Sequence, residues 1–215
     1  MRLKLLAGGV CLLAVSASLF LLLRPQRVAH AAPAAAPAYA ANGDMLPITH
    51  YREWVYLTTG IDMNYNPKAM AMDHSMFDNV FVNPDAYRSF LATGTWPDKT
   101  VMVLEVREAR DKGSIITRGH FQGEGVMGME VHVKDEARFP NKWAFFDFDS
   151  PAKNGTLIPE KAPCYSCHQQ HAAVDTTFVQ FYPTLLPLAR EKHTLSTEFA
   201  KEDAATQGQS DKVTK

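Results

Sequence analysis

The sequence TVMVLEV at residues 100–106 is rich in β-branched and other apolar residues, and it predicts a strand in the core of the protein. Residues 128–134 (GMEVHVK) alternate between apolar and polar side chains, which is typical of a half-buried strand. Residues 143–148 (WAFFDF) predict a third strand, and residues 79–84 (NVFVNP) predict a short one that ends at the proline.

Helical patterns are few and do not alternate with these strands. Residues 51–57 (YREWVYL) place apolar side chains at helical spacing, and residues 85–93 predict a helix that ends at Gly94. Residues 64–75 are expected to form a loop. A run of strands without strand–helix–strand units indicates an α+β fold, a single domain on an antiparallel β-sheet with a few flanking helices.

Both ends of the chain differ in composition from its centre. Residues 1–31 carry early positive charges, an apolar stretch and a small-x-small site, so they predict a signal peptide or a retained N-terminal membrane anchor. Residues 32–47 are Ala/Pro-rich and are expected to be a flexible linker. The folded domain is predicted at 48–193, and the polar residues 194–215 are expected to be disordered. Export predicts a periplasmic protein, either soluble or anchored to the inner membrane.

The charge balance and the cysteines exclude two classes of protein. The formal net charge is −1 and no basic stripe is present, so we expect no nucleic-acid partner. Cys11 lies in the leader, which leaves Cys164 and Cys167 for the rest of the chain. A scaffold held together by several disulfides is therefore excluded.

The two remaining cysteines belong to the motif Cys164-Tyr165-Ser166-Cys167-His168, near the C-terminal end of the predicted domain. In C-x-x-C-H the two thiols form thioethers with the vinyl groups of one haem, and the adjacent histidine binds its iron. We therefore expect one covalent haem c, with His168 as the iron ligand. His171 is expected to be a surface residue, because one helical turn cannot bring both imidazoles to the same iron.

Three other interpretations of the motif are weaker. A zinc site would need two further ligands at suitable spacing, and the chain has no second cysteine pair. A redox-active dithiol usually follows a strand in a βαβ unit, which the pattern does not show. A disulfide between Cys164 and Cys167 would leave His168 without a role.

Several blocks along the chain resemble the cytochrome P-460 family. They are YREWV at 51–55, VFVNPDAY at 80–87, TGTWPDKTV at 93–101, the stretch 133–146, CYSCH at 164–168 and FVQFYPTLL at 178–186. The resemblance covers about residues 51–186 and implies a periplasmic mono-haem protein, mostly antiparallel sheet, usually a homodimer, with His168 as the proximal ligand.

The family is also known for its distal pocket, where this chain departs from the hydroxylamine-oxidising enzymes. Those enzymes carry a lysine that cross-links to the haem, and ungapped alignment puts Leu104 at that position; Lys99 and Lys112 do not match it. A distal arginine is replaced by Asp78, whereas a glutamate is retained as Glu130.

Loss of the lysine makes the chain similar to the uncross-linked relatives, the cytochromes c′-beta. Those relatives bind nitric oxide or carbon monoxide beneath a crowded apolar cap. The resemblance implies that Leu104, with Phe77 and Met102 as neighbours, supplies such a cap here.

Three functions follow, and the sequence leaves all of them open. The first is binding of a small diatomic or nitrogen-oxide ligand at the haem iron. The second is electron transfer to a redox partner protein, with Met102, Met127 or Met129 as the sixth ligand. The third is hydroxylamine oxidation, for which Glu130 is the candidate catalytic base.

Overall fold

The computed structural model describes residues 36–63 and 74–213. The predicted leader at 1–31 and most of the predicted loop at 64–75 lie outside these residues. None of the helices in the described part of the chain is long and apolar enough to cross a bilayer.

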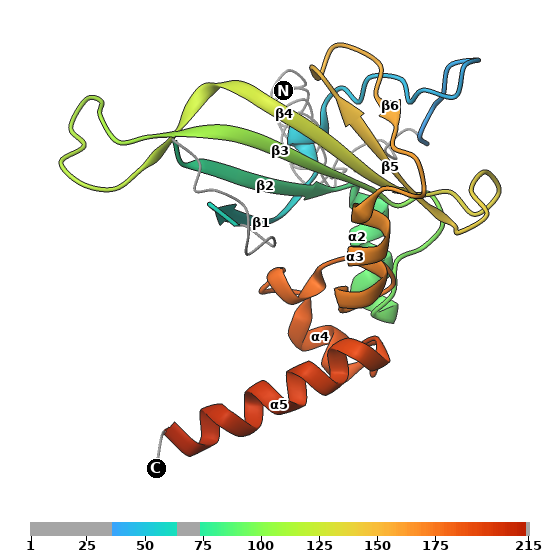
Figure 1. The fold of residues 1–215 in the computed structure, drawn as a ribbon, viewed down its shortest axis with the longest axis vertical. Coiled ribbons are helices and arrows are strands. Elements are labelled where there is room, and N and C mark those ends of the chain that lie inside the picture. The colour runs from blue at the N-terminus through green and yellow to red at the C-terminus, as the bar shows by residue number, and fades with distance from the viewer. Residues whose placement is uncertain (1–35, 64–73, 214–215) are drawn as a thin grey trace, which may run out of the picture. The chain divides into compact units, whose positions relative to one another are not determined.

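A six-stranded antiparallel sheet forms the centre of the described chain, with its strands in the order β1-β2-β3-β4-β5-β6 (Figure 1). Each strand therefore pairs with its neighbour in sequence, as in a meander. The strands are β1 (Val55–Ile61), β2 (Met76–Val82), β3 (Val101–Arg110), β4 (Phe121–Lys134), β5 (Trp143–Phe148) and β6 (Thr156–Leu157). The fold class predicted from the sequence is confirmed.

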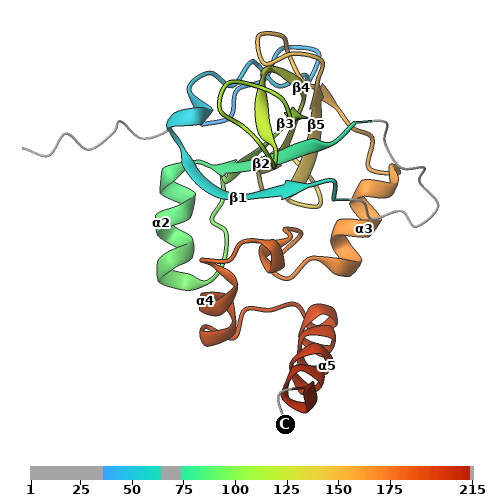
Figure 2. The same ribbon diagram turned by 90° about the vertical axis from the view of Figure 1, so that its left-hand side faces the viewer.

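The helices gather on one side of this sheet (Figure 2). They are α2 (Pro84–Thr93), α3 (Pro163–His171), α4 (Leu186–Glu191) and α5 (Thr197–Val213), with short 3-10 turns η1 (Tyr51–Glu53) and η2 (Val179–Phe181). Helix α2 begins with Pro84, whose fixed φ suits the first helical position, and ends at Gly94. Gly94 has φ 76°, a left-handed conformation that glycine adopts without steric cost.

The two faces of the sheet have separate apolar cores, because successive side chains of a strand point to opposite faces. On one face Val101 and Val103 of β3 pack with Val131 of β4 and Phe146 of β5. The other face packs against the helices through a core that contains Trp96, Phe90 and Leu185. The second face also holds the cavity described below.

The predicted linker differs from the structure where it is described. Met45 is fully buried in the first core and pairs with Gly155, while Tyr39 packs against Phe146 and lies beneath Arg138. The low complexity of residues 32–47 concealed these two large side chains, whose burial fixes the segment on the sheet. Residues 36–47 are therefore part of the domain.

The C-terminal tail also differs from the expected disorder, because residues 197–213 form α5. Phe199 is buried, and Arg190 of α4 makes two hydrogen bonds to Asp203, at 2.8 and 2.5 Å. Two parallel hydrogen bonds of this kind fix the orientation of α5 relative to α4 and also pair the two charges. The composition of the tail gave no sign of these tertiary contacts.

The helical spacing at residues 51–57 proved misleading. Residues 51–53 form a single 3-10 turn, and Val55 begins β1, which pairs with β2. A short apolar run fits both periodicities, and pairing with the neighbouring strand settles it in favour of β structure.

Candidate haem site

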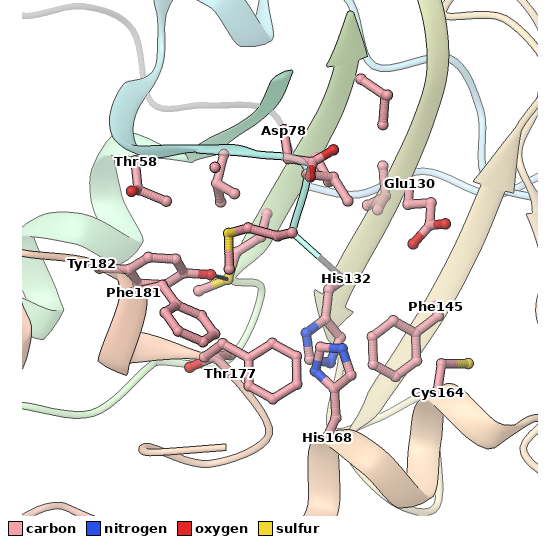
Figure 3. A pocket seen from close by; sticks show the side chains of 18 of the residues that line it. Thr58, Asp78, Glu130, His132, Phe145, Cys164, His168, Thr177, Phe181 and Tyr182 are labelled. Carbon is pink, nitrogen blue, oxygen red and sulfur yellow. Dashed lines mark hydrogen bonds between the residues drawn. The ribbon is translucent and has the colours of Figure 1, made fainter. Parts of the chain in front are cut away.

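A cavity of about 440 Å³ opens between the helix-covered face of the sheet and the chain that follows α3 (Figure 3). This volume falls in the usual range for cofactor and ligand sites. Side chains from β1 to β5, from α3 and from residues 177–182 line it. The cavity therefore brings together the haem-binding motif and the strands predicted to face it.

Helix α3 presents the motif to this cavity. Cys164, Cys167 and His168 stand at positions i, i+3 and i+4, which lie on one face of a helix, and all three line the cavity. Cys164 and Cys167 are not joined by a disulfide. Within the described residues, no group of three or more His, Cys, Asp or Glu side chains is placed to hold a metal ion by itself. This arrangement suits thioether attachment better than a zinc site.

The ring of His168 is oriented by the segment that follows the helix. Its Nδ1 lies 2.7 Å from the carbonyl oxygen of Thr176. Because a carbonyl can only accept, Nδ1 carries the proton and Nε2 keeps the lone pair needed to bind a metal. Burial lowers the pKa of His168, which also favours the neutral form. Metal-binding histidines characteristically donate their other N–H in this way.

Aromatic side chains hold the same ring from two sides. Phe178 lies 4.1 Å from His168 between ring centroids, and Phe145 of β5 lies 4.6 Å from it. The helix face, the ring tautomer and the apolar walls all fit a haem bound through Cys164, Cys167 and His168. His171 is exposed, does not line the cavity and stands 3.9 Å from Glu202.

Leu104 and Met102 of β3 line the cavity, as the sequence analysis expected. Val80 pairs with Leu104 from β2, and the Tyr182 hydroxyl lies 4.0 Å from the Met102 sulfur. Lysine does not occur among the described residues that line the cavity, and Lys99 is instead paired with Asp135. This wall is therefore largely apolar.

Phe77 does not line the cavity, contrary to expectation, and the adjacent Asp78 does. Successive side chains of a strand point to opposite faces, so Phe77 points away from the face of β2 on which Asp78 borders the cavity. Phe77 is thus removed from the candidate cap.

Two carboxylates border the cavity, Asp78 from β2 and Glu130 from β4, and both lie on the strands above His168 in Figure 3. Burial raises the pKa of Asp78, and the charge of Asp62 adds to the shift. Burial raises the pKa of Glu130 as well, with the charges of Asp147 and Asp78 contributing. Glu130 thus lies where the sequence analysis expected a pocket base.

The candidate methionine ligands are separated by the structure. Met102 lies in the cavity wall, Met129 is buried in the core on the other face, and Met127 is about half exposed. A methionine that sequence reasoning missed, Met63, also lines the cavity beside Gly60. A Cβ at Gly60 would lie 2.2 Å from the Met63 sulfur, so glycine leaves the space that this side chain fills.

His132 of β4 is the second functional candidate that sequence reasoning missed. It is buried, lines the cavity and stands beside His168, with the ring centroids 5.2 Å apart. The alternation of residues 128–134 already placed His132 on the same face as Glu130. Its proximity to His168 depends on tertiary packing, which the local sequence does not indicate.

Comparison with known proteins supports this site. No curated protein matches the chain. The family model described as Cytochrome P460 matches residues 48–179, a span that includes all five long strands, the cavity-facing helix and the C-x-x-C-H motif. Members of this family are haem cytochromes, and the residues of the cavity fit that cofactor. The chain therefore belongs to the cytochrome P460 family.

Proposed function

We propose that this protein is an exported mono-haem cytochrome that binds nitric oxide or another small diatomic, like the uncross-linked cytochromes c′-beta. The observation that carries this proposal is Leu104, which lines the cavity at the position where the resemblance places the cross-linking lysine. A leucine has no nitrogen with which to form that bond.

Three residues of α3 would hold the cofactor. Cys164 and Cys167 would bind it covalently through thioethers, and His168 would coordinate the iron through Nε2. If bound there, the haem would supply an iron that can accept a small ligand. The Thr176 carbonyl keeps the His168 ring in the tautomer that this coordination needs.

The residues of β2 and β3 would select the ligand. Leu104, Met102 and Val80 present apolar surface to the cavity. This surface disfavours water and charged ligands, because it offers no hydrogen bonds to replace those that they make in bulk water. A neutral diatomic loses little hydration on entering such a space. The apolar wall thus favours binding of a small gas.

Glu130 and Asp78 support a second candidate, hydroxylamine oxidation. Burial raises the pKa of both carboxylates, which makes them stronger proton acceptors, and a general base must accept a proton. Met102 and Met63 support a third, electron transfer with a methionine as sixth ligand and a redox partner protein. We rank both below gas binding, because cavity-lining methionines more often serve as packing and because the cross-linking lysine is replaced.

The proposal includes location and assembly. The leader at 1–31 supports export to the periplasm, as a soluble or N-terminally anchored protein. The family resemblance supports a homodimer. Fractionation of producing cells and sedimentation of the purified protein test these two points.

The functional test uses the purified holoprotein. We expect the reduced protein to bind carbon monoxide and nitric oxide, hydroxylamine turnover to be negligible, and haem peptides from a digest to contain only the Cys164–Cys167 segment. Rapid hydroxylamine oxidation, or a second peptide bound to the haem, would refute gas binding as the function. A reduced protein that does not bind carbon monoxide and shows a low-spin spectrum would favour methionine ligation.

A further inference from the structure

We infer that His132 is a positioning residue for the iron ligand, acting on His168 through Thr176. The inference rests on His168 being that ligand, as proposed above. It goes further by assigning a role to a buried histidine and to a threonine hydroxyl outside the C-x-x-C-H motif.

Thr176 contacts both histidines with different atoms. Its carbonyl oxygen accepts the hydrogen bond from His168 Nδ1 at 2.7 Å, and its hydroxyl oxygen lies 3.2 Å from His132 Nε2. The two bonds together connect β4 to the ring on α3. A side chain anchored at its hydroxyl restricts the backbone that carries the carbonyl, so His132 limits how far the Thr176 carbonyl can move from His168.

His132 is itself held rigidly. Its ring stacks on Phe145, with centroids 4.0 Å apart and an interplanar angle of 12°, and Trp143 packs against it at 4.4 Å. Burial excludes water that would compete for its nitrogen. The anchor is therefore fixed by the sheet rather than by a mobile loop.

The expected consequence is electronic as well as steric. A short hydrogen bond donated by Nδ1 makes Nε2 more basic and so a stronger electron donor to the iron. Mutation of the group that accepts this bond typically lowers metal affinity by about 10- to 100-fold. A stronger donor favours ferric over ferrous iron. Loosening the Thr176 carbonyl should therefore raise the midpoint potential of the haem and weaken its bond to His168.

The test compares single changes that remove one half of the contact. Thr176→Val removes the hydroxyl and keeps the carbonyl, while His132→Phe keeps an aromatic ring against Phe145 and removes the nitrogen. Thr176→Ser restores the hydroxyl. Thr100→Val is the control, because it makes the same chemical change at a threonine whose hydroxyl is also hydrogen-bonded, to the Pro97 carbonyl, and which does not line the cavity.

Two readouts are taken on each holoprotein, the midpoint potential and the iron–histidine stretching band of the reduced form. We expect Thr176→Val to favour ferrous iron about tenfold, a rise of about 59 mV for one electron. The stretching band should move to lower frequency. His132→Phe should shift the potential in the same direction, the double variant should add little to either change, and Thr176→Ser should restore the wild-type value.

Two outcomes overturn the inference in distinguishable ways. If Thr176→Val behaves like Thr100→Val, with lowered stability but an unchanged potential, Thr176 does not act on the iron ligand. If His168→Gly leaves the haem spectrum unchanged, the axial assignment itself is wrong and the inference fails with it. The potential decides the matter even if His132→Phe does not fold, because Thr176→Val tests the same contact.

Discussion

Glu105, on the face of β3 that points away from the cavity, should be one of the largest single contributors to stability. Its side chain is 3% exposed, and its carboxylate accepts hydrogen bonds from the Tyr51 hydroxyl, Arg52 and Arg107. Burial by itself would raise the pKa of Glu105, but the hydrogen bonds from Arg107 and Tyr51 and the charges of both arginines outweigh it and lower the pKa.

Glu105→Gln removes the charge and keeps the shape of this side chain. Breaking a buried ion pair by removing one partner costs about 3–5 kcal/mol. The lower end of this range applies here, because only one of the two arginines would be left as a mostly buried charge. Arg52 is 51% exposed, so water can solvate its charge in the variant, whereas Arg107 is 15% exposed. We expect a loss of about 3 kcal/mol at pH 7, which shifts a urea midpoint by about 1.5 M at a typical slope of about 2 kcal/mol per M.

The pH dependence has a definite sign. A carboxylate whose folded pKa lies below its unfolded value stabilises the fold above the unfolded pKa, and this stability is lost as the pH falls through the folded pKa. The difference between wild type and Glu105→Gln should therefore be full at pH 7 and should shrink in acid. Urea unfolding at several pH values measures it.

Glu108→Gln on the same strand is the control. Glu108 pairs with Arg110 at 3.0 Å, but both side chains are about half exposed, so this pair should contribute less than about 1 kcal/mol. The haem absorption spectrum should be unchanged in both variants. If Glu105→Gln costs no more than Glu108→Gln at pH 7, the reasoning about the buried network is refuted.

The other predictions concern the cavity. Cys164→Ala with Cys167→Ala should make the haem extractable by acid–acetone, and free extraction from the wild type would contradict covalent attachment. Leu104→Lys should fold, and its ammonium group should lower the pKa of Glu130, the cross-strand partner of residue 104, through charge attraction. Leu104→Met is the control, and an unfolded Leu104→Lys would show that the wall excludes an ammonium group. Burial and the charge of Asp147 raise the folded pKa of Glu130, so the stability of the wild type should fall as the pH rises above about 4.5. Glu130→Gln should remove this fall, and identical pH profiles for the two proteins would contradict the prediction.

The sheet could be predicted from local pattern, because its three central strands carry strong β signals. Residues 101–106, 128–134 and 143–148 all lie within strands, and the antiparallel class followed from the absence of strand–helix–strand units. The C-x-x-C-H motif likewise carries its geometry in its spacing, so the cavity-facing positions of Cys164, Cys167 and His168 followed from the sequence.

Contacts between distant segments could not be predicted in this way. The face to which Phe77 points is set by the pairing of β2 with β1 and β3, which are separate segments of the chain. The proximity of His132 to His168 depends on how α3 and the segment after it pack on β4, across more than thirty residues of sequence. Helix α5 and the segment around Met45 are fixed by burial against the domain, although their composition resembles that of a tail and a linker.

Strand β3 has a consequence for how this family can diversify. Leu104 and Val106 point to the cavity, whereas Val101 and Val103 point to the opposite core. Residues that line the site therefore alternate along one strand with residues that stabilise the fold. A substitution at position 104, such as Leu104→Lys, would change the cavity wall and leave the packing behind the strand intact. One scaffold can thus acquire different haem chemistries by substitutions that the fold tolerates, provided that the pairing of β3 with β4 keeps the two sets of positions apart.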